Sequence, residues 1–187
     1  GSGWNLICTD KNGFDKKQAA REMNRWLKRN YYYYSREWVY RDIQPRIICE
    51  KLLTAENGKL PDDYKIFCFD GVPRIVQVDS DRFTRHIRNF YDTEWNFLDY
   101  AVAFPNDKSK SKKKPERLDD MLEIARKLSS GFPQARIDLY NTGNKIYFGE
   151  ITFFHGGATE KFFQEEFARI MGDYLSLPLQ IHTPWKK

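Results

Sequence analysis

The sequence predicts an α+β fold in which a mostly antiparallel sheet has its flanking helices on one side. Two observations lead to this prediction. Stretches of alternating apolar residues are joined by short turn sequences, which is typical of antiparallel hairpins. Other stretches repeat apolar residues at helical spacing, and the order along the chain is helix, strands, helix, hairpin, helix. Elements grouped in this way favour an α+β architecture.

The composition is that of a folded protein with an anionic partner. The 187 residues are 41% hydrophobic and 16% aromatic, which is enough to bury a core in one domain, or in a domain with a small lobe. A formal net charge of +5 indicates a nucleotide, phosphate, nucleic acid or acidic glycan as partner. Three cysteines without C-x-x-C spacing predict buried free thiols rather than disulfides or a zinc site. No apolar run approaches the roughly 20 residues of a membrane span.

The first third of the chain predicts one helix between two strands. A glycine-rich start precedes a short strand at 4–8, and Asp15 can cap a helix that runs to about Arg29. The aromatic stretch 31–40 predicts a loop or a helical turn. Residues 46–53, RIICEKLL, form a continuous apolar run that predicts a strand ending in charged residues.

The rest of the chain predicts two hairpins, a basic linker and two helices. Turn chemistry marks the hairpins, and helical spacing marks the helices. In order, these elements are a hairpin over 64–82 that turns at Asp70-Gly71, a strand and a loop over 80–100, a linker over 105–117, a helix from Leu118 to Leu128 that Gly131 ends, a hairpin over 135–154, and a helix from about Glu160 to Leu175.

The hairpin over 135–154 collects polar residues on one face. If its loop has five residues, 141–145, then Asp138 and Glu150 become diagonal neighbours on that face, with backbones roughly 7–8 Å apart. Thr152 continues the same face, while the alternate residues enter the core. The opposed pairs in this register are Asp138 with Phe148 and Arg136 with Glu150.

Two interpretations of this polar face stay open. Two carboxylates at that distance can share Mg²⁺, which prefers hard oxygen ligands, and Arg136 beside them can hold a phosphate. Alternatively, the face is the solvated side of an antiparallel sheet. A one-residue change in the loop would also separate the carboxylates onto opposite faces. Spacing alone therefore does not decide between a metal site and a solvated surface.

Five segments, taken together and in order, carry a family resemblance. They are GSGWN, YYYYSREWVYRDIQPRIICEKLL, LPDDYKIFCFDGVPRIVQVDSDR, NFYDTEW and ARIDLYNTGNKIYFGEITFFHGG, and they span nearly all of the chain. The chain resembles the ATP-grasp superfamily, and most closely its TupA-like branch, which is associated with teichuronopeptide and capsular polysaccharide synthesis. The resemblance implies an ATP-grasp domain over 1–187, with a central subdomain that carries the glycine-rich loop at 1–60 and a C-terminal subdomain that carries the metal site at 61–187.

The resemblance also implies a preceding lobe with a further nucleotide-binding lysine, which these residues do not include. The expected fold is therefore an ATP-grasp domain lacking its N-terminal lobe, with little turnover by itself. The initial Gly-Ser-Gly is either a native phosphate-binding loop or a cloning remnant, and the Trp4-Asn5 that follows favours the native loop.

For the nucleotide, the resemblance implies three groups of residues. In related ligases a strand ending in Glu-Lys lines the adenine, an acidic residue at the start of the next strand holds the ribose, and a glycine-rich loop covers the phosphates. Lys65 alternates with apolar residues and either faces water or contacts the nucleotide. The implied residues are Glu50, Lys51 and Leu53 for adenine, Asp62 or Asp63 for ribose, and Gly1, Ser2 and Gly3 for the phosphates.

For the metal, the resemblance implies Asp138 and Glu150 as ligands. Thr152 stands where the family usually has an asparagine ligand. A hydroxyl can ligate Mg²⁺ or hold a water, although less well than an amide carbonyl. Arg136 would act as the catalytic cation, because it could stabilise charge on the transferred phosphoryl group or on a tetrahedral intermediate.

Substrate contacts are implied at two further places. Asn96 stands where the ligases have a phosphate-binding lysine, so another cation is expected to replace that charge. The residues that follow the metal strand lie where acceptor substrates bind in this fold. The candidates are Arg82, Arg85 and Arg88 for the missing charge, and His155, Gly156 and Gly157 for the substrate.

The implied function is an ATP- and Mg²⁺-dependent carboxylate–amine ligase that forms an acylphosphate. Its partners would be ATP, an acidic glycan or glycan-linked carboxylate, and an amine such as an amino acid, in the cytoplasm near the inner face of the membrane. One alternative on the same fold is phosphorylation of a sugar or glycan hydroxyl. A second is a nucleic-acid-binding module, which 31 basic against 26 acidic residues make a weak hypothesis, and we expect no nucleic-acid partner.

Overall fold

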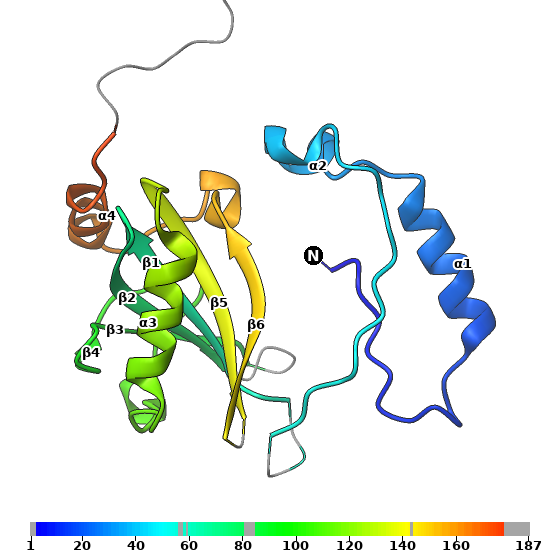
Figure 1. The fold of residues 1–187 in the computed structure, drawn as a ribbon, viewed down its shortest axis with the longest axis horizontal. Helices are drawn as coiled ribbons and strands as arrows, with labels where there is room; N and C mark the ends of the chain where they lie inside the picture. The colour runs from blue at the N-terminus through cyan, green and yellow to red at the C-terminus, as the bar shows by residue number, and fades with distance from the viewer. Residues whose placement is uncertain (1–2, 56–57, 59, 81–84, 143, 178–187) are drawn as a thin grey trace, which may run out of the picture. The chain divides into compact units, whose positions relative to one another are not determined.

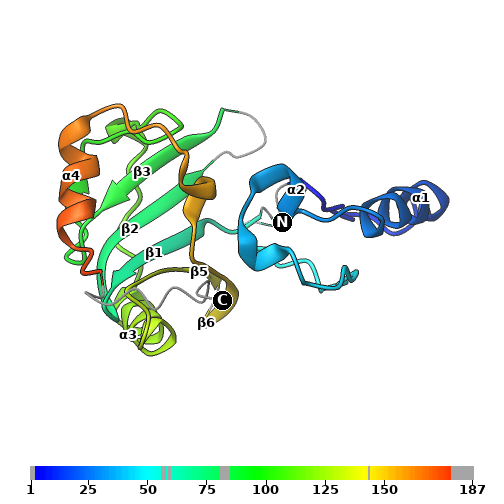
Figure 2. The same cartoon turned by 90° about the horizontal axis from the view of Figure 1, so that it is seen from above.

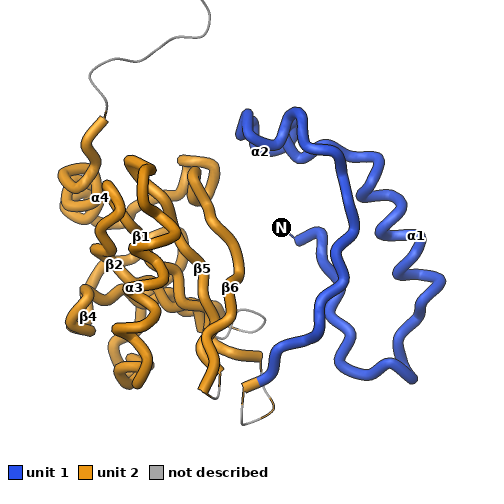
Figure 3. The backbone as a smooth tube through the Cα atoms, in the orientation of Figure 1, with its two compact units in different colours: residues 1–54 blue, residues 55–187 orange. Residues whose placement is uncertain are grey.

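A computed structural model describes residues 3–55, 58, 60–80, 85–142 and 144–177. The chain divides into two compact units, residues 1–54 and 55–187, which are coloured separately in Figure 3. The second unit contains the β-sheet that carries the polar hairpin (Figure 1). Among the described residues, no helix has both the length and the apolar character needed to cross a membrane.

The first unit consists of short helices joined by irregular chain. Helix α1 spans Lys16–Leu27, and the carboxylate of Asp15 accepts a hydrogen bond from the Gln18 backbone N–H at 2.9 Å, as the sequence predicts for an N-cap. The aromatic stretch forms α2 (Tyr32–Ser35) and the 3-10 helix η1 (Trp38–Tyr40). Edge-to-face ring contacts join Trp4, Tyr31, Tyr34 and Tyr40 into a small cluster.

Both strands predicted in the first unit are wrong. Residues 4–8 and 46–53 belong to neither a helix nor a strand. Residues 41–51 are exposed throughout, and no strand lies among the described residues of this unit to pair with them. An apolar run does not make a strand by itself, because its backbone groups need a neighbouring strand. Cys49 is exposed in this segment, so of the three cysteines only Cys68 is buried as predicted.

The second unit is built on a six-stranded antiparallel sheet. The order across the sheet is β4-β3-β2-β1-β5-β6, so that β1 is interior and β6 is an edge strand (Figures 1 and 2). A two-residue turn at Asp70-Gly71 joins β1 to β2, and its positive φ angles of 49° and 75° fit the predicted hairpin. The strands are β1 (Asp63–Phe69), β2 (Val72–Ser80), β3 (Ile87–Tyr91), β4 (Phe97–Leu98), β5 (Gln134–Thr142) and β6 (Lys145–Thr152).

Helices cover both faces of this sheet, so the α+β class is confirmed but the prediction of helices on one side is wrong. Helix α3 (Leu118–Ser129) packs on the face that holds Ile66, and α4 (Glu165–Asp173) packs on the opposite face, which holds Phe67. Figure 1 shows α3 lying along the sheet. All seven residues of β1 are buried, which is expected of a strand covered from both sides.

The two helices of the second unit differ in how well the sequence predicts their bounds. Helix α3 begins at Leu118 and stops before Gly131, whose φ of 85° is left-handed, as predicted. Helix α4 begins at Glu165 rather than at Glu160. The residues before it are held extended instead, because Phe162 forms a β-bridge with Val102 and the Phe163 N–H donates to a loop carbonyl.

Candidate active site

Polar residues line one end of the sheet face on which α4 packs. Strand pairing arranges them in rows. Lys65 of β1 lies opposite Gln77 of β2 on one side and opposite Asp138 of β5 on the other. Asp138 in turn lies opposite Glu150 of the edge strand β6. The next row across the same face consists of Asp63, Asp79 and Arg88.

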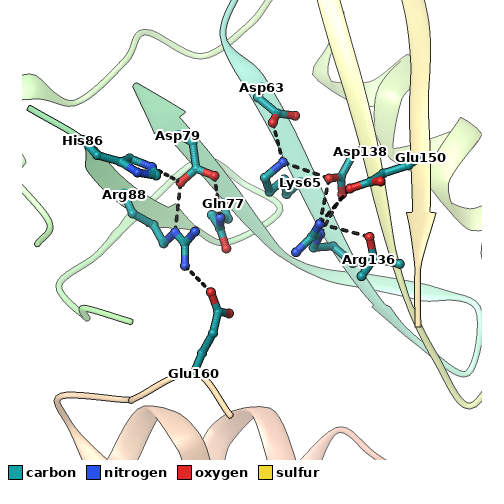
Figure 4. Close-up of polar contacts among 11 residues, drawn as sticks. Asp63, Lys65, Gln77, Asp79, His86, Arg88, Arg136, Asp138, Glu150 and Glu160 are labelled. Carbon is teal, nitrogen blue, oxygen red and sulfur yellow. Dashed lines mark hydrogen bonds and ion pairs between the residues drawn. The ribbon is translucent and has the colours of Figure 1, made fainter. Parts of the chain in front are cut away.

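The buried carboxylate of Asp138 organises one group of charges on this face (Figure 4). Its Oδ1 accepts a hydrogen bond from Arg136 Nε at 2.7 Å, and its Oδ2 accepts from Arg136 Nη2 at 2.8 Å. Lys65 Nζ donates to the same Oδ2 at 2.8 Å and also pairs with Asp63. We call the following set the Asp138 cluster: Asp63, Lys65, Arg136, Asp138, Glu150 and Thr152.

Arg136 connects the buried part of the Asp138 cluster to its exposed part. Its Nη2 donates to Thr152 Oγ1 at 3.0 Å and to Glu150 Oε1 at 3.4 Å. The Glu150 side chain is 59% exposed, so this carboxylate has room for further ligands. Burial lowers the pKa of Lys65 and of Arg136, but the neighbouring carboxylates, above all Asp138, outweigh it, and the pKa of each rises above its ordinary value. Both cations therefore stay charged at neutral pH.

The register of the β5–β6 hairpin differs from the predicted one. Thr142 pairs with Lys145, so the connection has two residues rather than five, and Asp138 lies directly opposite Glu150 instead of diagonal to it. A two-residue turn alone would place Glu150 on the other face of β6. The strand instead carries a β-bulge at Gly149, which is the extra residue between the Leu139 pair and the Asp138 pair. The bulge therefore returns Glu150 to the face of Asp138.

A second group of charges lies on the neighbouring strands β2 and β3 (Figure 4). Arg88 Nε donates to Asp79 Oδ1 at 2.9 Å, and Arg88 Nη1 donates to Glu160 Oε1 at 2.9 Å. Gln77 Nε2 donates to Asp79 Oδ2 at 3.0 Å, and His86 lies 3.0 Å from Oδ1. Burial raises the pKa of Asp79, but the charge and hydrogen bond of Arg88 outweigh it and lower the pKa. We call these five residues the Asp79 cluster.

The segment after β6 lies beside both clusters. The His155 ring meets the Phe67 ring edge-on, with centroids 5.1 Å apart. Burial lowers the pKa of His155, Glu160 opposes that effect, and the charges of Arg136 and Arg88 add to it. The Glu160 side chain lies so close over Gly156 that an added Cβ would stand 2.0 Å from its Cγ. This segment therefore holds a neutral imidazole next to the cations of the polar face.

Comparison of the sequence with known protein families identifies the family to which the chain belongs. A comparison with protein families matches residues 1–176 to TupA-like ATPgrasp. The chain belongs to the TupA-like ATP-grasp family. A search of curated proteins found no match, and a search of solved structures found none either. The suspected resemblance is thereby confirmed, and membership of the ATP-grasp family indicates an ATP-dependent enzyme of the ligase type.

The Asp138 cluster fits the Mg²⁺ ion that ATP-grasp enzymes generally use. It offers two facing carboxylates and a hydroxyl, which are hard oxygen donors. Among the described residues, no group of three or more His, Cys, Asp or Glu side chains could hold a metal ion unaided. Further ligands would therefore have to be phosphate oxygens and water, which is how Mg²⁺ usually binds beside nucleotides.

The structure brings together many of the site residues predicted from the ATP-grasp resemblance. The Asp138 cluster contains the predicted metal ligands, the predicted catalytic arginine, Lys65 and Asp63. His155, Gly156 and Gly157 follow directly as η3 (His155–Ala158). The roles of these residues stay predictions, but their proximity does not depend on them.

Other predicted residues lie elsewhere. Asp62 pairs with Lys112 at 3.0 Å. Burial raises the pKa of Tyr64, which packs on the α3 face, and the charge of Asp62 adds to this effect. Asp63 is therefore the better placed of the two ribose candidates. Arg85 is exposed, and Arg88 belongs to the Asp79 cluster. Gly3, Glu50, Lys51 and Leu53 belong to the first unit, and their part in nucleotide binding stays a prediction. Gly1, Ser2 and Arg82 lie outside the described residues.

Sequence reasoning missed four members of the Asp79 cluster: Gln77, Asp79, His86 and Glu160. The Asp70-Gly71 turn could not have revealed the first two, because a two-residue hairpin by itself would set Gln77 and Asp79 on the face opposite Lys65. A β-bulge between the Cys68–Pro73 pair and the Phe67–Ile75 pair returns them to the face of Lys65. No sequence signal places Glu160 beside Arg88, since their contact joins segments 72 residues apart.

Proposed function

We propose that the chain is an ATP- and Mg²⁺-dependent carboxylate–amine ligase that acts through an acylphosphate in cell-surface polysaccharide or teichuronopeptide biosynthesis. The observation that carries this proposal is the facing pair Asp138 and Glu150 in a chain of the TupA-like ATP-grasp family. Arg136 contacts both carboxylates, and Lys65 pairs with Asp138 from the neighbouring strand β1. Such an arrangement of cations and hard oxygen donors suits the handling of a polyphosphate.

The residues of the Asp138 cluster divide the work of such a reaction. Asp138, Glu150 and Thr152 would hold Mg²⁺, which when bound would offset the charge of the phosphates. A substrate carboxylate oxygen would attack the γ-phosphorus of ATP, and ADP would leave. Arg136 and Lys65 would stabilise charge on the transferred group. An amine would then form the C–N bond as the C–O bond to phosphate breaks, releasing phosphate and a proton.

The partners follow from the family rather than from a described pocket. We infer that the acceptor is an acidic glycan or a glycan-linked carboxylate, and that the amine is an amino acid, in the cytoplasm. Transfer of the phosphoryl group to a glycan hydroxyl would use the same cluster. Release of ADP that needs no amine would distinguish that phosphotransferase from the ligase.

Glu150→Gln is the sharpest test of the nucleotide and metal site. The Glu150 side chain is exposed, and its carboxylate lies 3.4 Å from Arg136 Nη2, so the substitution removes a metal ligand at little cost to the fold. We expect a non-hydrolysable ATP analogue to bind wild type in the presence of Mg²⁺, and to bind Glu150→Gln at least about tenfold more weakly, a loss of about 1.4 kcal/mol. Titration calorimetry with and without Mg²⁺ measures both.

The matched control is Glu123→Gln on α3. Glu123 has a similarly exposed side chain, at 53%, and pairs with Arg126 and Lys127 at 3.4 Å on the other face of the sheet. It should leave analogue binding unchanged. Asp138→Asn is less informative, because removing a buried partner from two cations costs about 3–5 kcal/mol of stability. Equal Mg²⁺-dependent affinity in wild type and Glu150→Gln would refute the metal assignment.

A further inference from the structure

The carboxylate of Asp138, proposed above as a metal ligand, is already paired with two cations of the protein itself. Both oxygens of Asp138 accept short hydrogen bonds, Oδ1 from Arg136 and Oδ2 from Arg136 and Lys65, at 2.7–2.8 Å. Asp138 is only 2% exposed, so water cannot replace these partners easily. A divalent ion approaching this carboxylate would meet an ammonium and a guanidinium at contact distance. Their mutual repulsion is strong where solvent does not screen it.

Lys65 is built so that it can leave Asp138 without losing its counter-ion. Its Nζ pairs with Asp63, two residues earlier on β1, as well as with Asp138, which lies opposite on β5. A small movement away from Asp138 keeps the ammonium paired with Asp63. Arg136 likewise retains Thr152 and Glu150 as neighbours if it turns from Asp138. Neither movement leaves a buried charge without a partner, which would otherwise cost several kcal/mol.

We propose that Lys65 couples nucleotide binding to metal binding in this site, an inference that rests on the proposed function. Without a nucleotide, Lys65 and Arg136 occupy the lone pairs of Asp138 and exclude the metal. The phosphates of a bound nucleotide attract both cations, and Asp138 becomes a ligand. Lys65 is therefore a positioning residue. While it pairs with Asp138 the metal is excluded, and when it pairs with the phosphates Asp138 is free to bind the metal.

The coupling has a thermodynamic consequence that does not require turnover. If the nucleotide raises the affinity for the metal by some factor, the metal must raise the affinity for the nucleotide by the same factor. Removing Lys65 should weaken this dependence, because one of the two excluding cations is then gone. The variant should bind a divalent ion that wild type by itself binds poorly.

The test is binding of Mn²⁺, followed by the loss of its free electron paramagnetic resonance signal, to wild type and to Lys65→Met without nucleotide. We expect the variant to bind Mn²⁺ at least about tenfold more tightly than wild type. Lys112→Met is the charge-matched control, because Lys112 is paired with Asp62 at 3.0 Å and its backbone contacts Tyr91 on the α3 face. It should leave Mn²⁺ binding as in wild type.

A second measurement uses wild type alone and so does not depend on the folding of the variant. Mn²⁺ should raise the affinity for a non-hydrolysable ATP analogue, and the analogue should raise the affinity for Mn²⁺. The two affinities should rise by the same factor, at least about tenfold. Tight Mn²⁺ binding by wild type without nucleotide would overturn the coupling and leave the proposed function standing, as would equal gains in Lys65→Met and Lys112→Met. Failure of the analogue to bind wild type with Mg²⁺ would overturn both.

Discussion

Asp79 illustrates how single carboxylates keep their charge inside this sheet. The residue is 3% exposed, yet its pKa lies below the ordinary value. Burial opposes the charged form, but Arg88, Gln77 and His86 surround the carboxylate with donors and positive charge. The carboxylate therefore stabilises the fold only while its partners and its charge are both present.

We predict that Asp79→Asn lowers the free energy of unfolding by about 3–5 kcal/mol at pH 7, because Arg88 loses the charge of its buried partner. Urea unfolding followed by circular dichroism measures the loss. Asp92→Asn is a suitable control, since Asp92 is half-buried at a turn and accepts hydrogen bonds from the backbone and side chain of Asn96. If Asp79→Asn lowers the free energy of unfolding as little as the control does, the charge of Asp79 does not stabilise its cluster.

We also predict how the difference in stability between wild type and Asp79→Asn depends on pH. The folded pKa of Asp79 is lowered from an unfolded value of about 3.9, so its stabilisation is complete above that value and is lost as the pH falls through the folded pKa. The difference in unfolding free energy between wild type and Asp79→Asn should be constant from pH 7 to about 5 and should narrow below about 4. A difference that widens on acidification would contradict the lowered pKa.

At the scale of elements, strand β6 shows how one residue decides what a hairpin presents. Gly149 is the extra residue of the bulge, and it lies against β5. A Cβ added there would stand 3.0 Å from the Asp138 carbonyl oxygen and 3.2 Å from the Tyr140 ring. Without the bulge, the alternation of β6 would turn Glu150 away from Asp138. A residue without a side chain therefore fits best at the bulge that makes the two carboxylates face each other.

We predict that Gly149→Ala destabilises the protein by about 1–3 kcal/mol, because the methyl group crowds the neighbouring strand. Mg²⁺-dependent binding of an ATP analogue should weaken as well, since Glu150 is displaced. Thermal unfolding and titration calorimetry measure the two effects. The control is Gly172→Ala in α4, where no atom lies within 4 Å of an added Cβ and about 0.5–1 kcal/mol of stabilisation is expected. Unchanged binding by Gly149→Ala would contradict the role of the bulge.

At the scale of the whole molecule, buried structure is concentrated in the second unit. Helix α3 and helix α4 close opposite faces of the sheet, and β1 is buried along its full length. In the first unit, residues 43–53 carry no regular secondary structure, and those up to Lys51 are exposed. Backbone amides that are buried in a sheet exchange only on extensive unfolding, whereas exposed ones exchange from the native state.

We predict that amide hydrogen exchange divides the chain accordingly. The amides of β1 should be among the slowest to exchange, at rates set by global unfolding. Those of residues 46–53 should exchange nearly as fast as in an unstructured peptide, because no strand pairs with them among the described residues. Mass spectrometry of peptic fragments resolves the two regions. Strong protection of the amides of residues 46–53 from exchange would contradict this prediction and support the strand that their sequence suggests.

Features with a local cause could be predicted from the sequence. Asp15 caps α1, Gly131 follows α3, and Asp70-Gly71 turns the first hairpin, each as expected. In each case the residues that determine the structure are neighbours in the chain, so propensity and hydrogen bonding within a few residues suffice. The gathering of Arg136, Asp138 and Glu150 on one hairpin face was also predicted, although from a register that the structure does not have.

By itself, the sequence determined the α+β class, the helices of the second unit, the family and the residues from which the Asp138 cluster is built. Only the tertiary structure decided their arrangement. The bulge that turns Glu150 toward Asp138, the lysine shared between Asp63 and Asp138, and the contact of Arg88 with Glu160 all join separate strands or loops. Such contacts depend on strand register and on packing between distant segments, and no periodicity within a segment encodes them.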